Sequence, residues 1–357
     1  MQETRVDIAV IGAGITGLVC ARHLQQAGYQ TVILEKSRGL GGRLATRRLE
    51  GTWADHGTRY LEPQGKWSDL LIQTLCDRGI VHLWTESLYQ WVEGQLSPLE
   101  HRPCYVAKDG ITAIAKYLGA NLNVQRQQRV TAITPQAGDW SLTLEATGTE
   151  SLTPITARAI VIAIPAPQAM LLLQPLAEVG LPDELLTAVG SVQFDPCFSA
   201  IATYPAARVA ELASLPWCGV IFKDDVDLSW VGLESRKQTV AQQPVVVVQS
   251  SARFAAQSLE ETNLQPIGQR LLTRAAEMLI PWLDTATILQ VHRWRYAFAQ
   301  TPLSTAYLAT TNPLPLVCGG DWCGGNNLES ALQSGMAIAH EINQRLDQRS
   351  MPELTVQ

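Results

Sequence analysis

Three glycines near the start of the chain, Gly12, Gly14 and Gly17, have the spacing G-x-G-x-x-G. In such a turn the first glycine permits a tight bend, the second lets a diphosphate approach the backbone, and the third lets the following helix pack closely. Ile15 and Thr16 open that helix, whose unpaired N–H groups and positive dipole end attract phosphate. The spacing therefore predicts a dinucleotide-binding turn made by these five residues.

The elements that such a turn requires are present on both sides of it. Residues 6–11 form a short apolar run typical of a buried parallel strand, and residues 15–26 predict a helix. Residues 31–34 predict a second strand, which ends in Glu35. A carboxylate at this distance from the turn meets a ribose hydroxyl in dinucleotide sites. This order of elements favours a binding site over a chance glycine turn.

The residues after Glu35 indicate which dinucleotide binds. Lys36 leads into a Gly41-Gly42-Arg43 triplet, and the segment resembles the second motif of flavoproteins of the amine oxidase and glutathione reductase superfamily. The resemblance implies that the glycine pair, with Gly42, lets the chain pass close to a flavin, and that Arg43 bridges the pyrophosphate and the isoalloxazine. Lys36 is counted with the cofactor-binding residues. The expected cofactor is therefore FAD.

Two segments in the middle of the chain extend this resemblance. Residues 129–133 resemble the strand whose backbone meets the adenine, here at Val130. Residues 157–167 resemble the buried strand that closes the nucleotide-binding sheet.

A third motif lies near the C-terminus. Residues 316–321 predict a strand that ends in Asp321, and residues 328–346 predict a helix. The resemblance implies that Asp321 accepts a hydrogen bond from the ribityl or phosphate region. It also implies that the helix N-terminus, at Asn327 and Leu328, faces the N1–C2=O edge of the flavin, where oriented N–H groups favour electron uptake.

The segments between these motifs predict a second, substrate-binding part. Their β-branched and aromatic residues are typical of strands in a mixed or antiparallel sheet, over residues 81–93, 198–204, 228–234, 244–251 and 288–296. On the last of these, His292 and Trp294 share one face and suit a planar ligand stacked near the flavin. Trp322 is a third catalytic candidate. Arg293 and Arg295 share the opposite face, where surface and ligand roles stay equally open.

A narrower resemblance extends over the whole chain. Residues 41–46, 55–60, 165–169 and 293–296 are together similar to renalase and its bacterial and plant relatives. The resemblance implies non-covalent FAD and the oxidation of off-isomer dihydroNAD(P), reduced at position 2 or 6, to NAD(P)+. A hydride passes to flavin N5, and molecular oxygen then takes the electrons and gives hydrogen peroxide. Residues 324–330 depart from the pattern, where relatives carry a Glu-Gly-Ala turn, so the substrate stays open.

The expected fold class is α/β. It combines a Rossmann-type FAD-binding domain, p-hydroxybenzoate-hydroxylase-like, with an inserted α+β substrate domain built on a mixed or antiparallel sheet. The FAD-binding domain is expected to be discontinuous, and the chain divides into residues 1–76, 104–170 and 299–347 for that domain, 77–103 and 171–298 for the substrate domain, and 348–357 as a loose tail.

Three alternatives remain beside the dihydronicotinamide oxidase. A flavin amine oxidase would hold a small amine in an aromatic cage, of which Trp322 offers one wall. A carotenoid or porphyrinogen desaturase relative would need a long apolar cavity. An FAD-binding protein without catalysis is the third. No cysteine lies in the 30 or so residues before Leu316, so the covalent flavin link of monoamine oxidases is not expected. In the first hypothesis, Arg59 or another arginine meets the substrate pyrophosphate.

The composition of the chain argues against several other classes of protein. A net charge of −6 argues against a nucleic-acid partner, and no apolar run reaches the roughly 20 residues of a membrane span. Seven cysteines without a Cys-x-x-Cys pair indicate neither a disulfide framework nor a metal site, so a cytoplasmic location is expected. The oligomeric state stays open.

Overall fold

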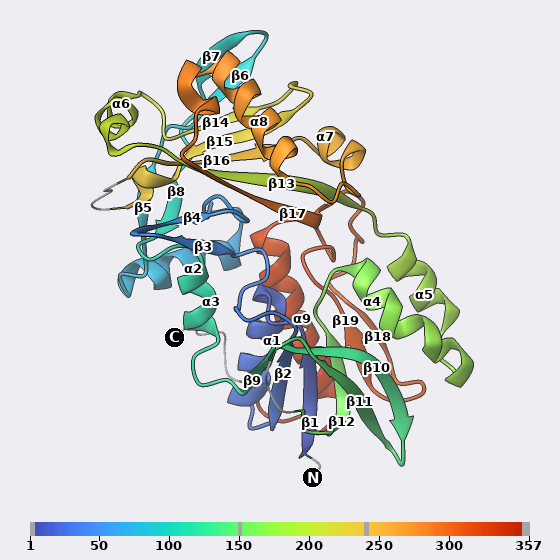
Figure 1. The fold of residues 1–357 in the computed structure, drawn as a ribbon. Coiled ribbons are helices and arrows are strands. Elements are labelled where there is room, and N and C mark those ends of the chain that lie inside the picture. The colour runs from blue at the N-terminus through green and yellow to red at the C-terminus, as the bar shows by residue number, and fades with distance from the viewer. Residues whose placement is uncertain (1–3, 149–151, 239–242, 352–357) are drawn as a thin grey trace.

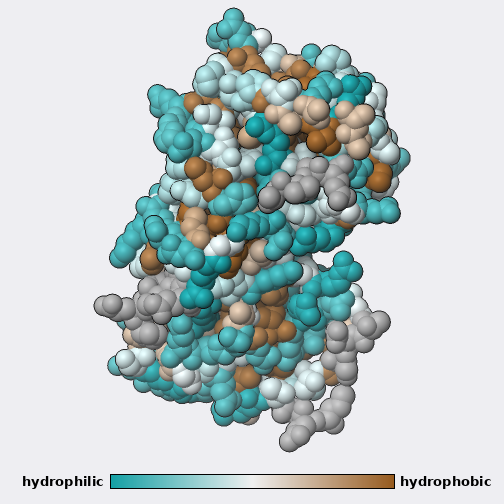
Figure 2. All heavy atoms as spheres, turned by 90° about the vertical axis from the view of Figure 1, so that its left-hand side faces the viewer, coloured by the Kyte–Doolittle hydropathy of each residue, from teal (hydrophilic) through white to brown (hydrophobic). Residues whose placement is uncertain are grey.

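The computed structural model describes residues 4–148, 152–238 and 243–351 (Figure 1). Two large sheets lie one above the other in the view of Figure 1, and a small hairpin lies between them. Among the helices of these ranges, none is long and apolar enough to cross a membrane. On the face seen in Figure 2, hydrophilic side chains predominate and apolar ones are scattered among them.

The lower sheet has eight strands in the order β10-β11-β12-β1-β2-β9, with β19 beside β12 and β18 beside β19. Its parallel centre comprises β1 (Thr4–Ile11), β2 (Thr31–Glu35), β9 (Val124–Arg126), β12 (Ile155–Ile162) and β19 (Leu316–Cys318). The antiparallel strands are β10 (Gln128–Gln136), β11 (Asp139–Ala146) and β18 (Leu308–Thr310). A parallel centre of this kind needs helices on both faces.

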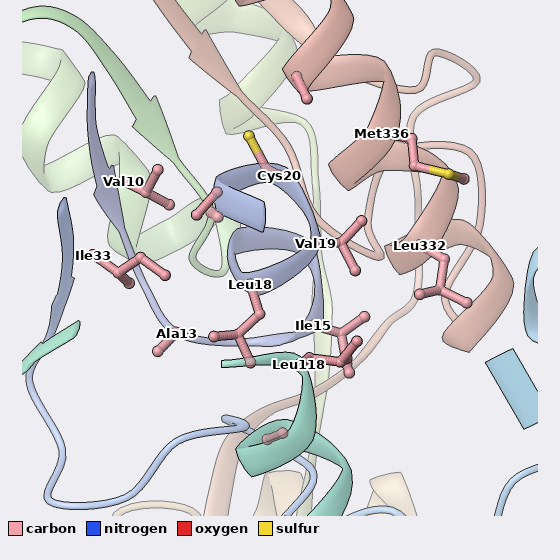
Figure 3. Packing of buried hydrophobic residues seen from close by; sticks show 14 of the residues in the cluster. Val10, Ala13, Ile15, Leu18, Val19, Cys20, Ile33, Leu118, Leu332 and Met336 are labelled. Atoms are coloured by element: carbon pink, nitrogen blue, oxygen red, sulfur yellow. The ribbon is translucent and has the colours of Figure 1, made fainter. Parts of the chain in front are cut away.

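Alternate residues of β1 face two different apolar clusters, as the period of a strand requires. Ile8 and Val10 pack with α1 (Ile15–Gln26), α3 (Thr112–Leu118) and α9 (Leu328–Arg345), an arrangement seen from close by in Figure 3. Ala9 and Ile11 pack instead with α4 (Ala166–Leu173) and α5 (Asp183–Gly190). The α/β class and the predicted strand–turn–helix–strand start of the chain are confirmed.

The upper sheet has seven strands in the order β17-β13-β16-β15-β14-β6-β7. The strands are β6 (Tyr89–Val92), β7 (Gln95–Pro98), β13 (Phe194–Thr203), β14 (Gly219–Phe222), β15 (Leu228–Leu233), β16 (Val245–Ser250) and β17 (Ile288–Ala299). All neighbouring pairs are antiparallel except β14 with β6, so the sheet is mixed. Apolar side chains join it to the helices α6 (Val209–Ser214), α7 (Ala252–Gln257) and α8 (Gln265–Met278).

Two small antiparallel pairs and one helix complete the region between the sheets. The hairpin joins β3 (Thr46–Leu49) to β4 (Thr52–Asp55), and β5 (Val81–Thr85) pairs with β8 (Cys104–Ala107). Helix α2 (Lys66–Asp77) follows the hairpin. Short 3₁₀ helices cover Gln174–Val179, Ala206–Arg208, Glu234–Lys237 and Pro281–Asp284.

Some expectations from the sequence change in detail. Residues 81–93, expected as strands of the substrate sheet, divide between β5, outside that sheet, and β6, inside it. Residues 171–192, assigned to the substrate domain, place most of their leucines and valines in the apolar cluster that also contains Ala9 and Ile11 of β1, while Leu171 and Val179 are exposed. We therefore propose that the chain enters the upper domain near residue 193. Within the predicted loose tail, Arg349 is hydrogen-bonded to Asn343, and residues 352–357 lie outside the described residues.

Candidate functional site

The three glycines of the first turn have different surroundings. A Cβ on Gly17 would lie 2.1 Å from the carbonyl oxygen of Gly12, and one on Gly12 would lie 2.6 Å from that of Ala163. Gly12 also has a φ of +104°, which side chains rarely adopt. A Cβ on Gly14, in contrast, would meet no atom within 4 Å. Gly12 and Gly17 therefore close the turn against strand and helix, while Gly14 leaves its outer side open.

Helix α1 begins at Ile15 directly behind this open position. Its N-cap is Gly14, which offers no side chain to the first N–H groups. Ile15 and Thr16 are buried, and the Thr16 hydroxyl donates a 3.0 Å hydrogen bond to the carbonyl of Ala331 on α9. The helix end is thus fixed against α9 and directs its N–H groups toward the open side of the turn.

The second glycine turn lies beside the first. Gly41 N–H donates to the carbonyl of Ala13 at 2.8 Å, and a Cβ on Gly42 would stand 3.7 Å from Gly14 Cα. At the base, the buried Glu35 carboxylate accepts hydrogen bonds from the N–H groups of Ala13 at 2.9 Å and Ser37 at 2.7 Å. Glu35 therefore positions the turn at the end of β2.

Lys36 and Val130, two other predicted cofactor-binding residues, lie on strands or loops beside these glycine turns. Lys36 is exposed, and its carbonyl accepts a hydrogen bond from the Thr147 hydroxyl after β11. Val130 is buried where β10 carries an irregular register with β11.

Arg43 and Asp321 connect the second and third motifs. The guanidinium contacts the carboxylate through two nitrogens, at 2.7 Å for Nη1–Oδ2 and 2.5 Å for Nη2–Oδ1. Arg43 Nη1 also donates to the carbonyl of Ala297 on β17 at 2.9 Å. The pair is half-buried on the arginine side and buried on the aspartate side, so it joins the lower sheet to the upper one at the level of the motifs.

The start of α9 is held by its own cap. Asn327 Oδ1 accepts from the N–H of Ser330, and Ser330 Oγ accepts from the N–H of Asn327, each at 3.0 Å. Leu328 is the first residue of the helix. Glu329 reaches across to α2, where its carboxylate accepts from the N–H groups of Trp67 and Ser68. The third motif therefore caps a second helix besides its own.

Trp322 has a packing role. It is 1% exposed within the apolar cluster under the lower sheet, and its Nε1–H donates to the carbonyl of Ile164 at 3.1 Å. Its ring therefore fastens the end of β19 to the segment after β12. Trp322 is therefore not among the residues that we propose to contact the substrate.

His292 and Trp294 lie together with a third ring, that of His56. The ring centroids are 4.3 Å apart for His292 and Trp294, 4.9 Å for His56 and His292, and 5.5 Å for His56 and Trp294. Trp294 also lies close to the second motif, because a Cβ on Gly57 would stand 3.2 Å from its ring and 2.0 Å from the Arg43 carbonyl oxygen. This aromatic group, His56, His292 and Trp294, is therefore adjacent to the flavin motifs.

Both imidazoles of the aromatic group are held neutral. Burial, His292 and Arg47 together lower the pKa of His56 to about 3. Burial and Arg47 lower the pKa of His292 to about 4. Each ring therefore carries one N–H near neutral pH, and neither supplies a positive charge.

The opposite face of β17 has a structural role. Arg293 Nη1 donates to the carbonyls of Leu259 and Glu261, and Arg295 forms a bidentate ion pair with Glu260. The sequence left a surface role and a ligand role open for Arg293 and Arg295. These contacts favour the surface role, in which both side chains hold β17 against the segment after α7.

Arg59, the arginine considered for a pyrophosphate, is held by neutral partners. Its Nε donates to Gln249 at 2.6 Å, its Nη2 donates to Ser229 at 3.0 Å, and its guanidinium lies over the ring of Trp230. It points into the upper sheet and is positioned by β15 and β16.

Sequence reasoning missed His56 and Arg47. His56 stands in the 55–60 segment that supported the renalase resemblance, but nothing in its spacing related it to residues 292–294. Arg47 is one of many arginines, and only the register of the hairpin places it near the aromatic group. Within the described ranges, no three His, Cys, Asp or Glu side chains gather as a metal site requires.

Solved structures of other proteins share the fold of this chain. The chain is similar over 96% of its length to putrescine oxidase bound to putrescine, with 100% of that chain covered, a TM-score of 0.70 and 12% identity. Cyclohexylamine oxidase from Brevibacterium oxydans gives a TM-score of 0.69 at 13% identity, with 96% and 99% covered. At this identity the likeness concerns the fold.

Curated relatives match only short segments. AofH of Mycobacterium tuberculosis, which carries the name of a flavin-containing monoamine oxidase, is 32% identical over 90 residues, or 24% of this chain and 19% of that protein. The L-amino acid dehydrogenase of Synechocystis is 34% identical over 58 residues, or 16% of this chain and 12% of that protein. The chain thus spans less than a fifth of the length of these two relatives.

Two family models cover most of the chain. Residues 10–74 match the NAD(P)-binding Rossmann-like domain, and residues 86–343 match the flavin containing amine oxidoreductase model. The second match extends over well more than half of the sequence and includes β17, β19 and α9. The protein therefore belongs to the family of flavin containing amine oxidoreductases.

Proposed function

We propose that this protein is an oxidoreductase that binds FAD non-covalently and oxidises a small donor by hydride removal. The observation that carries the proposal is the continuity between the paired glycine turns and the aromatic group of His56, His292 and Trp294. The two turns meet at Gly14 and Gly42. Gly57 lies against both the Arg43 carbonyl and the Trp294 ring, so the second turn and the aromatic group are in contact through this residue. A flavin supplies the hydride acceptor when it is bound.

The residues present fit a dinucleotide flavin. The open side of Gly14 and the uncapped N-terminus of α1 suit a pyrophosphate, and the Glu35 carboxylate stands at the end of β2 where a ribose is recognised. Arg43 and Asp321 form a charged pair that contacts β17 of the upper sheet. We propose that these residues hold FAD, with Val130, Asn327 and Leu328 at its two ends.

We infer that the donor is an off-isomer dihydronicotinamide dinucleotide, with molecular oxygen as the electron acceptor. Hydride transfer needs stacking distance and orientation more than an acid or base, and the aromatic group offers a flat indole beside two neutral imidazoles. A protonated amine would be repelled here, because Arg47 places positive charge beside these rings.

Oxidation of a small amine is the second candidate. It is favoured by the family model and by the fold shared with putrescine and cyclohexylamine oxidases. The amine would enter deprotonated, with the Trp294 ring as one wall of its site.

The two donors are distinguished by anaerobic reduction of the FAD-loaded protein. The purified protein is mixed with 2- and 6-dihydroNAD(P), with ordinary NAD(P)H and with a set of amines, and loss of the visible flavin absorbance is followed as the sign of reduction. Bleaching by the dihydro isomers, followed by peroxide on aeration, supports the first candidate. Bleaching by amines alone replaces it with the second, and no FAD in the purified or reconstituted protein overturns both.

A further inference from the structure

The hairpin β3–β4 presents a guanidinium to the aromatic group. Arg47 pairs in register with Ala54, and the His56 N–H donates to the Ala45 carbonyl, which extends the hairpin by one position. Residues opposite or two apart in such a ladder share a face. Ala54 packs on Ile201, Val245 and Val247 of the upper sheet, so Arg47 and His56 face the same way, toward the sheet that carries His292.

The Arg47 guanidinium has a buried N–H group without a hydrogen-bond acceptor. Among the described residues it makes no hydrogen bond or ion pair, and its Nε is a buried donor without an acceptor. His56 Nδ1 is also buried without a hydrogen bond of good geometry, although the backbone of Ala45 and Ala54 lies near enough to the imidazole to raise its pKa against the effect of burial. Of the seven buried orphan polar atoms in the described ranges, two therefore belong to one small cluster. Such groups cost free energy unless a ligand or another partner satisfies them.

The acidic groups around Arg47 are engaged elsewhere. Asp55 lies between Ala54 and His56 and points to the opposite face of the hairpin, where Thr46 Oγ1, Ile111 N–H and Lys237 contact its carboxylate. Arg48 also lies on that face and donates to the carbonyl of Asp109. The positive charge of Arg47 is thus uncompensated within the described residues, and neutral imidazoles surround it.

We propose that Arg47, with His56 and His292 as neutral hydrogen-bonding neighbours, binds an oxyanion of the donor, a carboxylate or a phosphate group. The inference rests on the proposed function, since it assigns the substrate class of the same site. A guanidinium fork matches both oxyanions and binds either in bidentate fashion. Trp294 contacts both His56 and His292 and lies beside the turn at Gly57, so a donor whose acidic group binds at Arg47 would lie next to the flavin motifs.

The first arm of the test is equilibrium binding, which does not depend on turnover. The FAD-loaded protein is titrated with pyrophosphate and, separately, with benzoate, and the flavin spectrum and tryptophan fluorescence are followed. Arg47→Gln should weaken the binding of whichever probe the wild type recognises by about tenfold or more, and Arg47→Lys should weaken it less. Arg48→Gln is the matched control, since its guanidinium lies on the other face of the hairpin, and should leave binding unchanged.

The second arm uses donors with and without the acidic group. For dihydronicotinamides these are the dinucleotide and the riboside, and for amines an amino acid and its decarboxylated amine. Arg47→Gln should raise KM for the acidic donor by about tenfold or more and leave that of its neutral counterpart unchanged. Equal effects on both donors, unchanged probe binding, or loss of FAD retention in Arg47→Gln would overturn the oxyanion site, the last because the guanidinium would then serve the cofactor.

The two arms separate the proposals from each other. If no donor bleaches the flavin while probe binding depends on Arg47, the proposed function fails and the oxyanion site stands. If acidic donors bleach the flavin equally well in the wild type and Arg47→Gln, the function stands and the oxyanion site fails.

Discussion

His56 is the residue that connects the candidate site to the rest of the molecule. Its carbonyl accepts hydrogen bonds from Ser199 Oγ at 2.7 Å and from Trp294 Nε1 at 2.8 Å, while its ring lies against both His292 and Trp294. Burial is the main cause of its low pKa, so the ring resists protonation far below neutral pH. In the folded protein the His56 ring therefore stays uncharged when the solution becomes mildly acidic.

The low pKa of His56 predicts a dependence of stability on pH. Below pH 6.5 the unfolded chain binds a proton at His56, while the folded protein does not until about pH 3, so the free energy of unfolding falls as the pH falls. Between pH 7 and pH 5 this single group costs about 2 kcal/mol. Urea unfolding of His56→Gln should therefore show a smaller loss over this interval than the wild type.

His101→Gln makes the same exchange at an exposed histidine, so it measures how far the slope responds to the loss of any imidazole. A wild-type slope in His56→Gln would show that the ring is protonated equally in both states, against the environment described above.

At the scale of elements, the start of the chain could be predicted because its signals are local. The glycine spacing and the apolar runs place β1, α1 and β2 within two residues of their bounds. The 81–93 segment could not be divided in this way, since β5 and β6 are both short and rich in β-branched and aromatic residues, and the distant strand with which each one pairs decides its sheet. The approach of Arg47 to His292 depends on two sheets meeting, which no local pattern records.

The first glycine turn allows binding and folding to be tested separately. Gly14→Ala adds a methyl group where no atom lies within 4 Å, at a φ of −73° that alanine adopts freely. The variant should keep the wild-type midpoint of urea unfolding without cofactor but bind FAD at least about tenfold more weakly, because the methyl group occupies the approach of the pyrophosphate. Gly17→Ala places the same group 2.1 Å from the Gly12 carbonyl oxygen and should lower stability itself by several kcal/mol.

Urea unfolding of the FAD-free proteins and fluorescence titration with FAD measure the two effects. If Gly14→Ala binds FAD as the wild type does, the pyrophosphate does not pass over this turn. If Gly17→Ala unfolds at the wild-type midpoint, strand and helix are free to separate and the close contact does not stabilise the fold.

At the scale of the whole molecule, a buried charged group of Asp55, Glu234 and Lys237 joins the β3–β4 hairpin to the upper sheet. Lys237 Nζ lies 2.8 Å from Glu234 and 3.4 Å from Asp55, donates to the carbonyl of Arg59 at 2.6 Å, and is fully buried. Burial acts to lower the pKa of Lys237, but the two carboxylates raise it above its ordinary value. The segment 55–60, which carries His56, is therefore fixed at both ends by residues that follow β15.

Lys237→Met should remove this connection, because it leaves two buried carboxylates facing each other without a cation. Loss of one partner from a buried ion pair costs about 3–5 kcal/mol, and this loss should appear in urea unfolding of the FAD-loaded protein. Flavin reduction should also slow, since His56 then loses its fixed position beside Trp294. Lys223→Met makes the same exchange at an exposed lysine and should change neither quantity. Equal unfolding midpoints for the two variants would mean that the charged group contributes nothing to the connection between the hairpin and the upper sheet.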